Sequence, residues 1–228
     1  MDKILTIGHR GAKGHFPENT LASFQKAILM GCDGVELDVH MSADGEIVVI
    51  HDETVDRTTC GSGQVKRLTL SQLKSLKIDN RHEVPTLREV IDLVGKQKLI
   101  NIELKTDAAA KPVARLISKY VSEDNWRYRS FLVSSFDWNA LKKIREWNPE
   151  IPLGVLTQTN LELAIGFAEF IKAETIHPHF HLLTAENTIE IHNKGFKVFT
   201  WTVNEPADIE KIRQFKISGI ITDFPQRV

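Results

Sequence analysis

Short apolar runs recur along the whole chain, with helix-like spacing of apolar residues between successive runs. The runs are Ile4–Gly8, Gly34–Val39, Leu99–Leu104, Phe131–Ser135, Leu153–Leu156, Glu174–Pro178, Val198–Val203 and Gly219–Thr222. Strands that alternate with helices are typical of parallel crossover units. Eight such units in 228 residues predict an α/β fold, a closed (β/α)8 TIM barrel. An open doubly wound sheet is the alternative, but no Gly-rich dinucleotide signature follows the first run.

The barrel is expected to be a single domain that spans residues 1–228. Between Glu53 and Val84 the regular alternation stops, and Thr, Gly, Ser and Lys become more frequent. This segment predicts a small insertion after the second strand, with a short helix near Leu70–Leu76. The chain ends six residues after Thr222, so a full eighth outer helix is not expected.

Composition excludes several classes of function. The net charge is −1, and no basic stripe predicts binding to nucleic acid or to an anionic membrane. The two cysteines, Cys32 and Cys60, have neither a metal-binding nor a redox spacing, so a reducing compartment is expected. No apolar run is long enough for a signal-peptide core or a membrane anchor. These features predict a cytoplasmic protein.

The stretch from Gly34 to Asp52 carries an unusual pair of carboxylates. Side chains alternate along a strand, so Glu36 and Asp38 share one face and the apolar residues share the other. Two like charges on a buried strand are costly unless a cation or a proton neutralises them. A turn at Ala43–Gly45 predicts a hairpin that brings His51 close to the pair. A surface hairpin with a solvated acidic face is the alternative.

Polar side chains also fall at the ends of other predicted strands, where barrels carry their chemistry. They are His9 and Arg10 after the first strand, Glu103 and Lys105 at the third, and Trp201 at the seventh. Taken singly, each has a structural interpretation, as a core histidine, an outward ion pair or a core tryptophan. We expect Trp201 to pack over the substrate and not within the barrel core.

The combined set of residues indicates phosphoester cleavage. Glu36, Asp38 and Glu103 would bind one hard divalent cation, Mg²⁺ or Ca²⁺. Arg10 and Lys105 would then hold a phosphate. His9 and His51 could act as general base and general acid near neutral pH, in either order. A metal, cationic donors and imidazoles together suit hydrolysis of a phosphodiester.

A second histidine cluster, His177, His179 and His181, follows the sixth predicted strand. The spacing is compatible with a metal site, but no carboxylate or cysteine lies nearby in the sequence. We interpret these histidines as structural, with a metal site as the alternative.

Short motifs occur along nearly the whole chain: His9-Arg10-Gly11, Pro17-Glu18-Asn19-Thr20, Glu36-Leu37-Asp38, His51-Asp52, Asp56-Arg57-Thr58-Thr59 with Gly61 and Gly63, Pro85-Thr86-Leu87, Glu103-Leu104-Lys105, Trp201-Thr202-Val203-Asn204 and Thr222-Asp223-Phe224-Pro225. Together they resemble the glycerophosphodiester phosphodiesterase family, in its bacterial cytoplasmic form. The resemblance implies a (β/α)8 barrel with a small insertion after the second strand. It also implies metal ligands at Glu36, Asp38 and Glu103, acid–base roles for His9 and His51, and phosphate contacts from Arg10 and Lys105.

The same resemblance implies a small-molecule glycerophosphodiester substrate. The expected products are an alcohol and sn-glycerol 3-phosphate, from a metal-dependent reaction. A lysophospholipase D or sphingomyelinase D-like enzyme is an alternative, but the polar segment from Glu53 to Val84 offers no membrane-seeking loop for an acyl chain. A non-catalytic barrel that binds phosphodiesters is a second alternative, and the presence of both histidines argues against it.

Overall fold

A closed barrel of eight parallel strands forms the centre of the molecule. The computed structural model describes residues 3–228. The barrel strands are β1 (Leu5–Gly8), β2 (Gly34–Met41), β6 (Leu99–Leu104), β7 (Phe131–Ser135), β8 (Leu153–Thr157), β9 (Thr175–Pro178), β10 (Lys197–Thr200) and β11 (Gly219–Thr222). Strand β1 pairs with β11 on one side and with β2 on the other, which closes the sheet. The prediction of a (β/α)8 barrel is therefore confirmed, and the open sheet is excluded.

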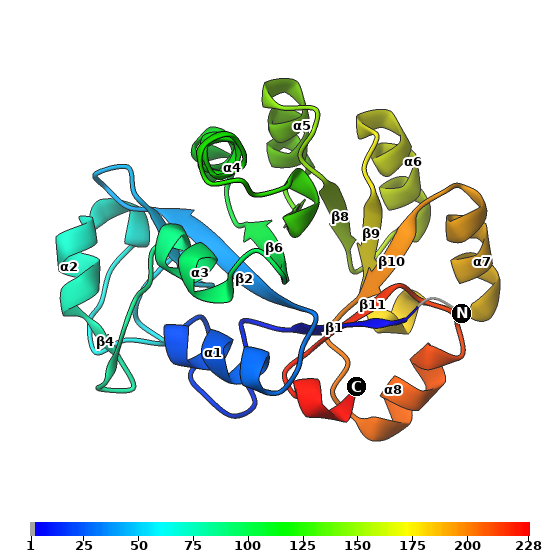
Figure 1. The fold of residues 1–228 in the computed structure, drawn as a ribbon, viewed down its shortest axis with the longest axis horizontal. Coiled ribbons are helices and arrows are strands. Elements are labelled where there is room, and N and C mark those ends of the chain that lie inside the picture. The colour runs from blue at the N-terminus through cyan, green and yellow to red at the C-terminus, as the bar shows by residue number, and fades with distance from the viewer. Residues whose placement is uncertain (1–2) are drawn as a thin grey trace.

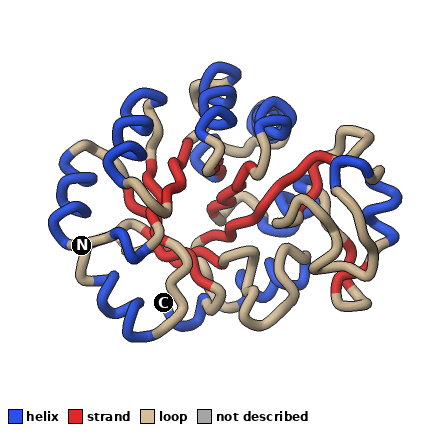
Figure 2. Tube along the Cα trace, turned by 180° about the vertical axis from the view of Figure 1, so that it is seen from behind, coloured by secondary structure: helices blue, strands red, loops and turns tan. Residues whose placement is uncertain are grey.

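Helices surround the barrel, as Figures 1 and 2 show. They are α1 (Leu21–Leu29), α3 (Leu87–Val94), α4 (Ala110–Glu123), α5 (Trp138–Trp147), α6 (Leu161–Ile171), α7 (Ala185–Asn193) and α8 (Pro206–Arg213). The start of α1 is set by Thr20, whose hydroxyl accepts a hydrogen bond from the Ser23 amide. After β11 the chain forms only a short 3-10 turn, Pro225–Arg227. No helix among residues 3–228 has the length and apolar character needed to cross a bilayer.

The alternation of side chains divides each barrel strand between two environments. On β2, Val35, Leu37 and Val39 are completely buried in the main core, which lies between the barrel and its helices. Glu36 and Asp38 therefore point to the other side, into the barrel. A second apolar cluster, Ile7, Leu132, Phe199 and Ile221, fills part of the barrel interior. The same alternation thus builds the core and places charge inside the barrel.

The chain leaves the barrel between β2 and α3. Strand β3 (Ile47–Val49) turns back and pairs antiparallel with β2, with Val39 opposite Val49. The segment that follows contains η1 (Val65–Arg67), α2 (Leu70–Ser75), β4 (Lys77–Ile78) and β5 (His82–Glu83), and Figure 1 shows it beside the barrel. It has its own small apolar cluster, which includes Val55, Val65 and Leu73. This segment supplies polar residues to the site described below.

Candidate active site

Three carboxylates converge inside the barrel. Asp38 on β2 lies opposite Glu103 on β6, and Glu36 opposes Asn101. Oxygen atoms of Glu36, Asp38 and Glu103 all lie within 4.8 Å of one another. Burial, followed by repulsion from the neighbouring carboxylates, raises the pKa of Glu36 well above its ordinary value and that of Glu103 to about 7. The neighbouring cationic side chains therefore do not fully neutralise the three carboxylates.

The donor set fits a hard divalent cation. All three side chains offer carboxylate oxygens, the ligands that Mg²⁺ and Ca²⁺ prefer. Oε1 of Glu36 is buried and has no hydrogen-bond partner among residues 3–228. Burying a carboxylate oxygen without a partner beside two other carboxylates is costly, and a cation bound between the three side chains offsets that cost.

Arg10 lies where the chain turns sharply after β1. Its backbone adopts the left-handed region with φ 51°, and its amide donates to Oε2 of Glu36 over 2.9 Å. The guanidinium donates to Oε1 of Glu18 over 2.8 Å, and its Nε lies 3.3 Å from Oδ2 of Asp38. Although burial opposes ionisation, Arg10 and Lys105 lower the pKa of Asp38.

Lys105 follows directly after β6. Its ammonium donates to Oε1 of Glu103 over 2.7 Å and lies 3.5 Å from Oδ1 of Asp38. It also lies 3.2 Å from Nε2 of His51. The sequence predicts that Arg10 and Lys105 hold an anion, and the structure places both against the carboxylates. Both side chains line the cavity in which that anion would bind.

Each of the two predicted histidines is held by an aspartate. Nδ1 of His9 donates to Oδ1 of Asp223, and Nδ1 of His51 donates to Oδ1 of Asp52, both over 2.6 Å. Hydrogen bonds lower the pKa of both aspartates, mainly from Arg57 for Asp52 and, against the effect of burial, from His9 for Asp223. Ionised carboxylates can only accept, so each Nδ1 carries the proton and each Nε2 is turned away from its aspartate. Nε2 of His51 faces the Lys105 ammonium at 3.2 Å. Burial lowers the pKa of His9.

A cavity of about 100 Å³ joins these groups. Seven of the eight predicted site residues line it: His9, Arg10, Glu36, His51, Glu103, Lys105 and Trp201. Asp38 lies beside them, in contact with Arg10 and Lys105. The structure thus brings all eight together.

Several supporting residues received no role in the sequence analysis. Asp223 and Asp52 hold the histidines, Asn204 donates to Asp223 over 2.8 Å, and Asn19 donates to Asp38 over 2.9 Å. All four occur in the motifs that carry the family resemblance. Asp223 also directly follows a barrel strand, so the strand-end rule that selected His9 would have selected it.

Trp201 lies at the edge of this cavity, just after β10. Its indole Nε1 donates to the main-chain oxygen of His177 over 2.8 Å, and its ring contacts Phe136 edge-on with centroids 5.4 Å apart. It also packs against the apolar cluster inside the barrel. Trp201 therefore contacts both the candidate substrate cavity and the core.

We expect Trp201→Phe to lower kcat/KM several-fold, because the smaller ring covers less of the cavity wall. The change also leaves the buried His177 carbonyl without its donor, at a cost of about 1–3 kcal/mol in unfolding free energy. Trp201→Ala is expected to cost roughly 3–5 kcal/mol. Steady-state kinetics beside thermal unfolding separate the two effects. An unchanged kcat/KM in Trp201→Phe would limit Trp201 to a structural role.

The second histidine cluster does not join this site. His177 is completely buried, and its Nε2 lies 2.8 Å from the Thr175 hydroxyl. His179 stacks on Phe180 and contacts the Trp201 ring edge-on. Within residues 3–228, the one group of His, Cys, Asp or Glu ligands close enough to share a metal ion is Glu36, Asp38 and Glu103. This arrangement favours the structural interpretation.

Repulsion among the carboxylates predicts a pH-dependent effect of Glu103→Gln in cation-free protein. Folded Glu103 keeps its proton up to about pH 7, whereas in the unfolded chain the carboxyl loses its proton near its ordinary pKa of 4.5, so the folded state loses stability as the pH rises between these two values. Glu103→Gln should therefore stabilise the protein more at about pH 8 than at about pH 5, by roughly 1–3 kcal/mol. Urea unfolding of both proteins with chelator measures this. The wild type and the variant both contain His9 and His177, so the effect of their titration on stability cancels in the difference between the two proteins. An equal effect at the two pH values would contradict the prediction.

Comparison with known proteins gives a consistent family. Residues 9–227 match the model of the glycerophosphoryl diester phosphodiesterase family. A glycerophosphodiester phosphodiesterase from Caldanaerobacter subterraneus subsp. tengcongensis is 38% identical, over 98% of this chain and 96% of its own. One from Bacillus subtilis is 32% identical, over 98% of this chain and 85% of its own.

Solved structures agree with this comparison. A glycerophosphodiester phosphodiesterase from Thermotoga maritima superposes with a TM-score of 0.84 at 33% identity, over 99% of this chain and 97% of that one. An Oleispira antarctica phosphodiesterase, solved with the product sn-glycerol-3-phosphate, gives a TM-score of 0.88 at 29% identity, over 97% of this chain and 93% of that one.

Proposed function

The chain belongs to the glycerophosphoryl diester phosphodiesterase family, and we propose that it hydrolyses glycerophosphodiesters to an alcohol and sn-glycerol 3-phosphate. The observation that carries this proposal is the convergence of three carboxylates and two aspartate-held histidines on one cavity. The Oleispira antarctica relative, solved with sn-glycerol-3-phosphate, supports the choice of product.

Glu36, Asp38 and Glu103 would hold one divalent cation, Mg²⁺ or Ca²⁺. When bound, such a cation supplies positive charge that stabilises the developing negative charge on phosphate oxygens. The unpartnered Glu36 oxygen and the raised pKa values of Glu36 and Glu103 support this assignment.

Arg10 and Lys105 bind the phosphate of the substrate in this proposal. Both line the cavity, and the planar guanidinium of Arg10 suits two phosphate oxygens at once. Trp201, which lines the same cavity, covers the glycerol portion. These contacts orient the phosphorus between the two histidines.

His9 is the general base and His51 the general acid. Burial lowers the pKa of His9, which favours the neutral imidazole that a base needs. Nε2 of His9 takes the proton from the attacking hydroxyl. When water attacks, sn-glycerol 3-phosphate forms directly. When the 2-hydroxyl of the substrate's glycerol attacks, a cyclic phosphate forms first, and water then opens it to sn-glycerol 3-phosphate. Nε2 of His51 gives a proton to the departing alkoxide. Asp223 and Asp52 fix the two rings through Nδ1.

The test is turnover by purified protein with Mg²⁺ or Ca²⁺, and with chelator. The substrates are glycerophosphocholine, glycerophosphoethanolamine, glycerophosphoinositol and lysophosphatidylcholine, and released sn-glycerol 3-phosphate is measured. We expect cation-dependent release from at least one glycerophosphodiester, and none from a protein with both histidines replaced. Turnover of lysophosphatidylcholine alone would favour a lysophospholipase D, and binding without turnover would favour a non-catalytic barrel.

A further inference from the structure

Arg57 lies outside the barrel, in the segment after β3, and joins two parts of the candidate site. We propose that Arg57 is a positioning residue, which holds Asp52 against His51 and Glu18 against Arg10. Its effect on turnover rests on the proposed function, whereas its effect on the geometry of His51 does not.

The first contact of Arg57 is with Asp52. Nε donates to Oδ2 of Asp52 over 2.6 Å, and Nη2 donates to Oδ1 over 2.9 Å. The same Oδ1 accepts the Nδ1 proton of His51 over 2.6 Å. A carboxylate that accepts hydrogen bonds at both oxygens has little freedom to rotate. Arg57 therefore fixes Asp52, and Asp52 in turn fixes the orientation of the His51 ring.

The second contact is with Glu18. Nη2 of Arg57 donates to Oε1 of Glu18 over 2.7 Å, and Nη1 donates to Oε2 over 3.1 Å. Oε1 also accepts from the Arg10 guanidinium over 2.8 Å. Both carboxylates that Arg57 contacts therefore contact a predicted catalytic or phosphate-binding residue in turn.

An arginine is specifically suited to this position. Its planar fork presents several donors in fixed directions, so one side chain can grip two carboxylates at once. A lysine ammonium lacks this fork, so it could not contact both oxygens of Asp52 and both oxygens of Glu18. The Arg57 side chain is 48% exposed, whereas that of Glu18 is 10% exposed, so the network runs from the surface into the site.

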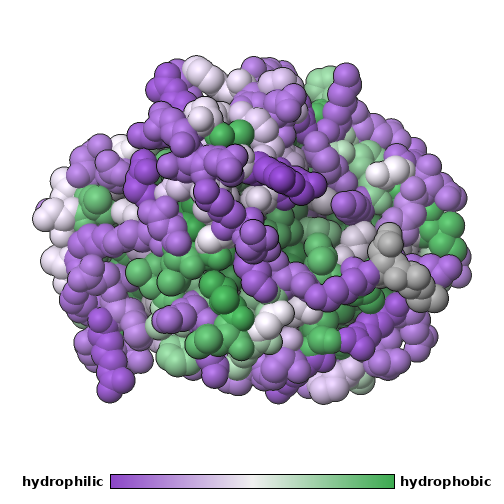
Figure 3. All heavy atoms as spheres, in the orientation of Figure 1, coloured by the Kyte–Doolittle hydropathy of each residue, from purple (hydrophilic) through white to green (hydrophobic). Residues whose placement is uncertain are grey.

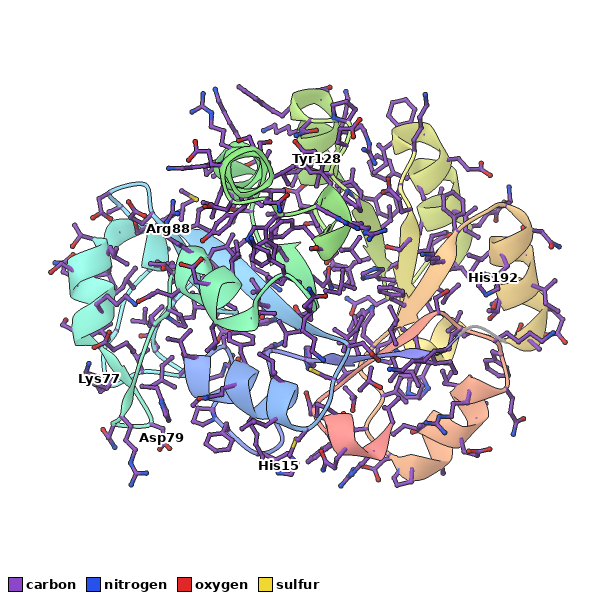
Figure 4. The ribbon with its side chains drawn as sticks, viewed as in Figure 1. His15, Lys77, Asp79, Arg88, Tyr128 and His192 are labelled. Atoms are coloured by element: carbon purple, nitrogen blue, oxygen red, sulfur yellow. The ribbon has the colours of Figure 1, made fainter. Side chains whose placement is uncertain are left out.

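Arg57 is reachable from solvent. It lines a surface hollow of about 440 Å³, together with Glu18 and Lys77. Small cations can therefore replace its guanidinium in a truncated variant. Lys77, labelled in Figure 4, belongs to the same segment and pairs with Glu83 over 2.7 Å. Lys77 makes no hydrogen bond or ion pair with Asp52 or Glu18, which makes Lys77→Gln a matched control.

The first experiment measures kcat and KM for Arg57→Ala, Arg57→Lys, Lys77→Gln and Asp52→Asn/Arg57→Ala. We expect Arg57→Ala to lose about 10–100-fold in kcat, the usual effect of removing a group that orients a site residue. Millimolar guanidinium should restore part of the loss, and Arg57→Lys should retain part. The double variant should be scarcely slower than Asp52→Asn, because both changes act on His51. Lys77→Gln should match the wild type.

The second experiment follows the His51 Nδ1 proton by NMR, which needs no turnover. A low-field signal that is absent from His51→Gln should be present in the wild type and in Lys77→Gln, and broadened or lost in Arg57→Ala.

Two results would overturn the role of Arg57: a wild-type His51 signal in Arg57→Ala, or losses in kcat that multiply in the double variant. An inactive wild type would overturn the proposed function alone, since the NMR result still decides how Arg57 acts.

Discussion

Glu36→Gln is expected to abolish measurable hydrolysis of glycerophosphodiesters and to weaken cation binding sharply. Glu36 is buried, its Oε1 has no partner among residues 3–228, and one of its carboxylate oxygens lies within 4.8 Å of oxygens of Asp38 and Glu103. Loss of the cation would remove several kcal/mol of transition-state stabilisation, which corresponds to about 10³-fold or more in rate. Kinetics and calorimetric titration with Mg²⁺ and Ca²⁺ measure the two effects.

The fold should survive this substitution. Removing one of three mutually repelling carboxylates relieves strain in cation-free protein, so its melting temperature should stay level or rise. Glu46→Gln is a suitable control, because Glu46 is an exposed carboxylate on the same hairpin. Wild-type protein treated with chelator should be as inactive as the variant. Full activity in the presence of chelator would show that the metal assignment is wrong.

The barrel and its strand-end residues could be read from the sequence because both depend on local pattern. Alternation along β2 alone puts Glu36 and Asp38 on the inner face, and the register with β6 then brings Glu103 beside Asp38. The hairpin likewise follows from a turn between two apolar runs. Its returning arm is joined to β2 by a hydrogen bond from the Ile50 amide to the Asp38 carbonyl, over 3.0 Å.

The partners of these residues could not be derived in the same way, because they depend on closure of the whole barrel. Asp223 reaches His9 only because β11 pairs with β1 across 214 positions of sequence. Arg57 reaches Glu18 only because the segment after β3 folds back over the loop that follows β1. Nothing in the local sequence specifies either contact. The contacts of Arg10 and Lys105 with the carboxylates also require the strands to be assembled, because they depend on how closely the carboxylates approach one another.

Replacing either His9 or His51 with Ala is expected to reduce kcat by about 10²-fold or more, the scale of a positioned proton-transfer group. Cation affinity should change little, because neither histidine belongs to the carboxylate cluster. The double variant should be scarcely slower than the poorer single variant, since residues that act as a unit are not additive. If both single variants lose cation binding in step with activity, the histidines are ligands instead.

The choice of leaving group separates the roles of the two histidines. A p-nitrophenyl phosphodiester of glycerol needs little protonation of its leaving group, so it should restore activity only to the variant that lacks the acid. Because burial favours neutral His9, we expect rescue of His51→Ala and not of His9→Ala. Asp52→Asn should behave as a weaker form of His51→Ala, since Asp52 holds the Nδ1 proton of that ring. Rescue of His9→Ala alone would reverse the assignment of base and acid while leaving the histidine pair in place.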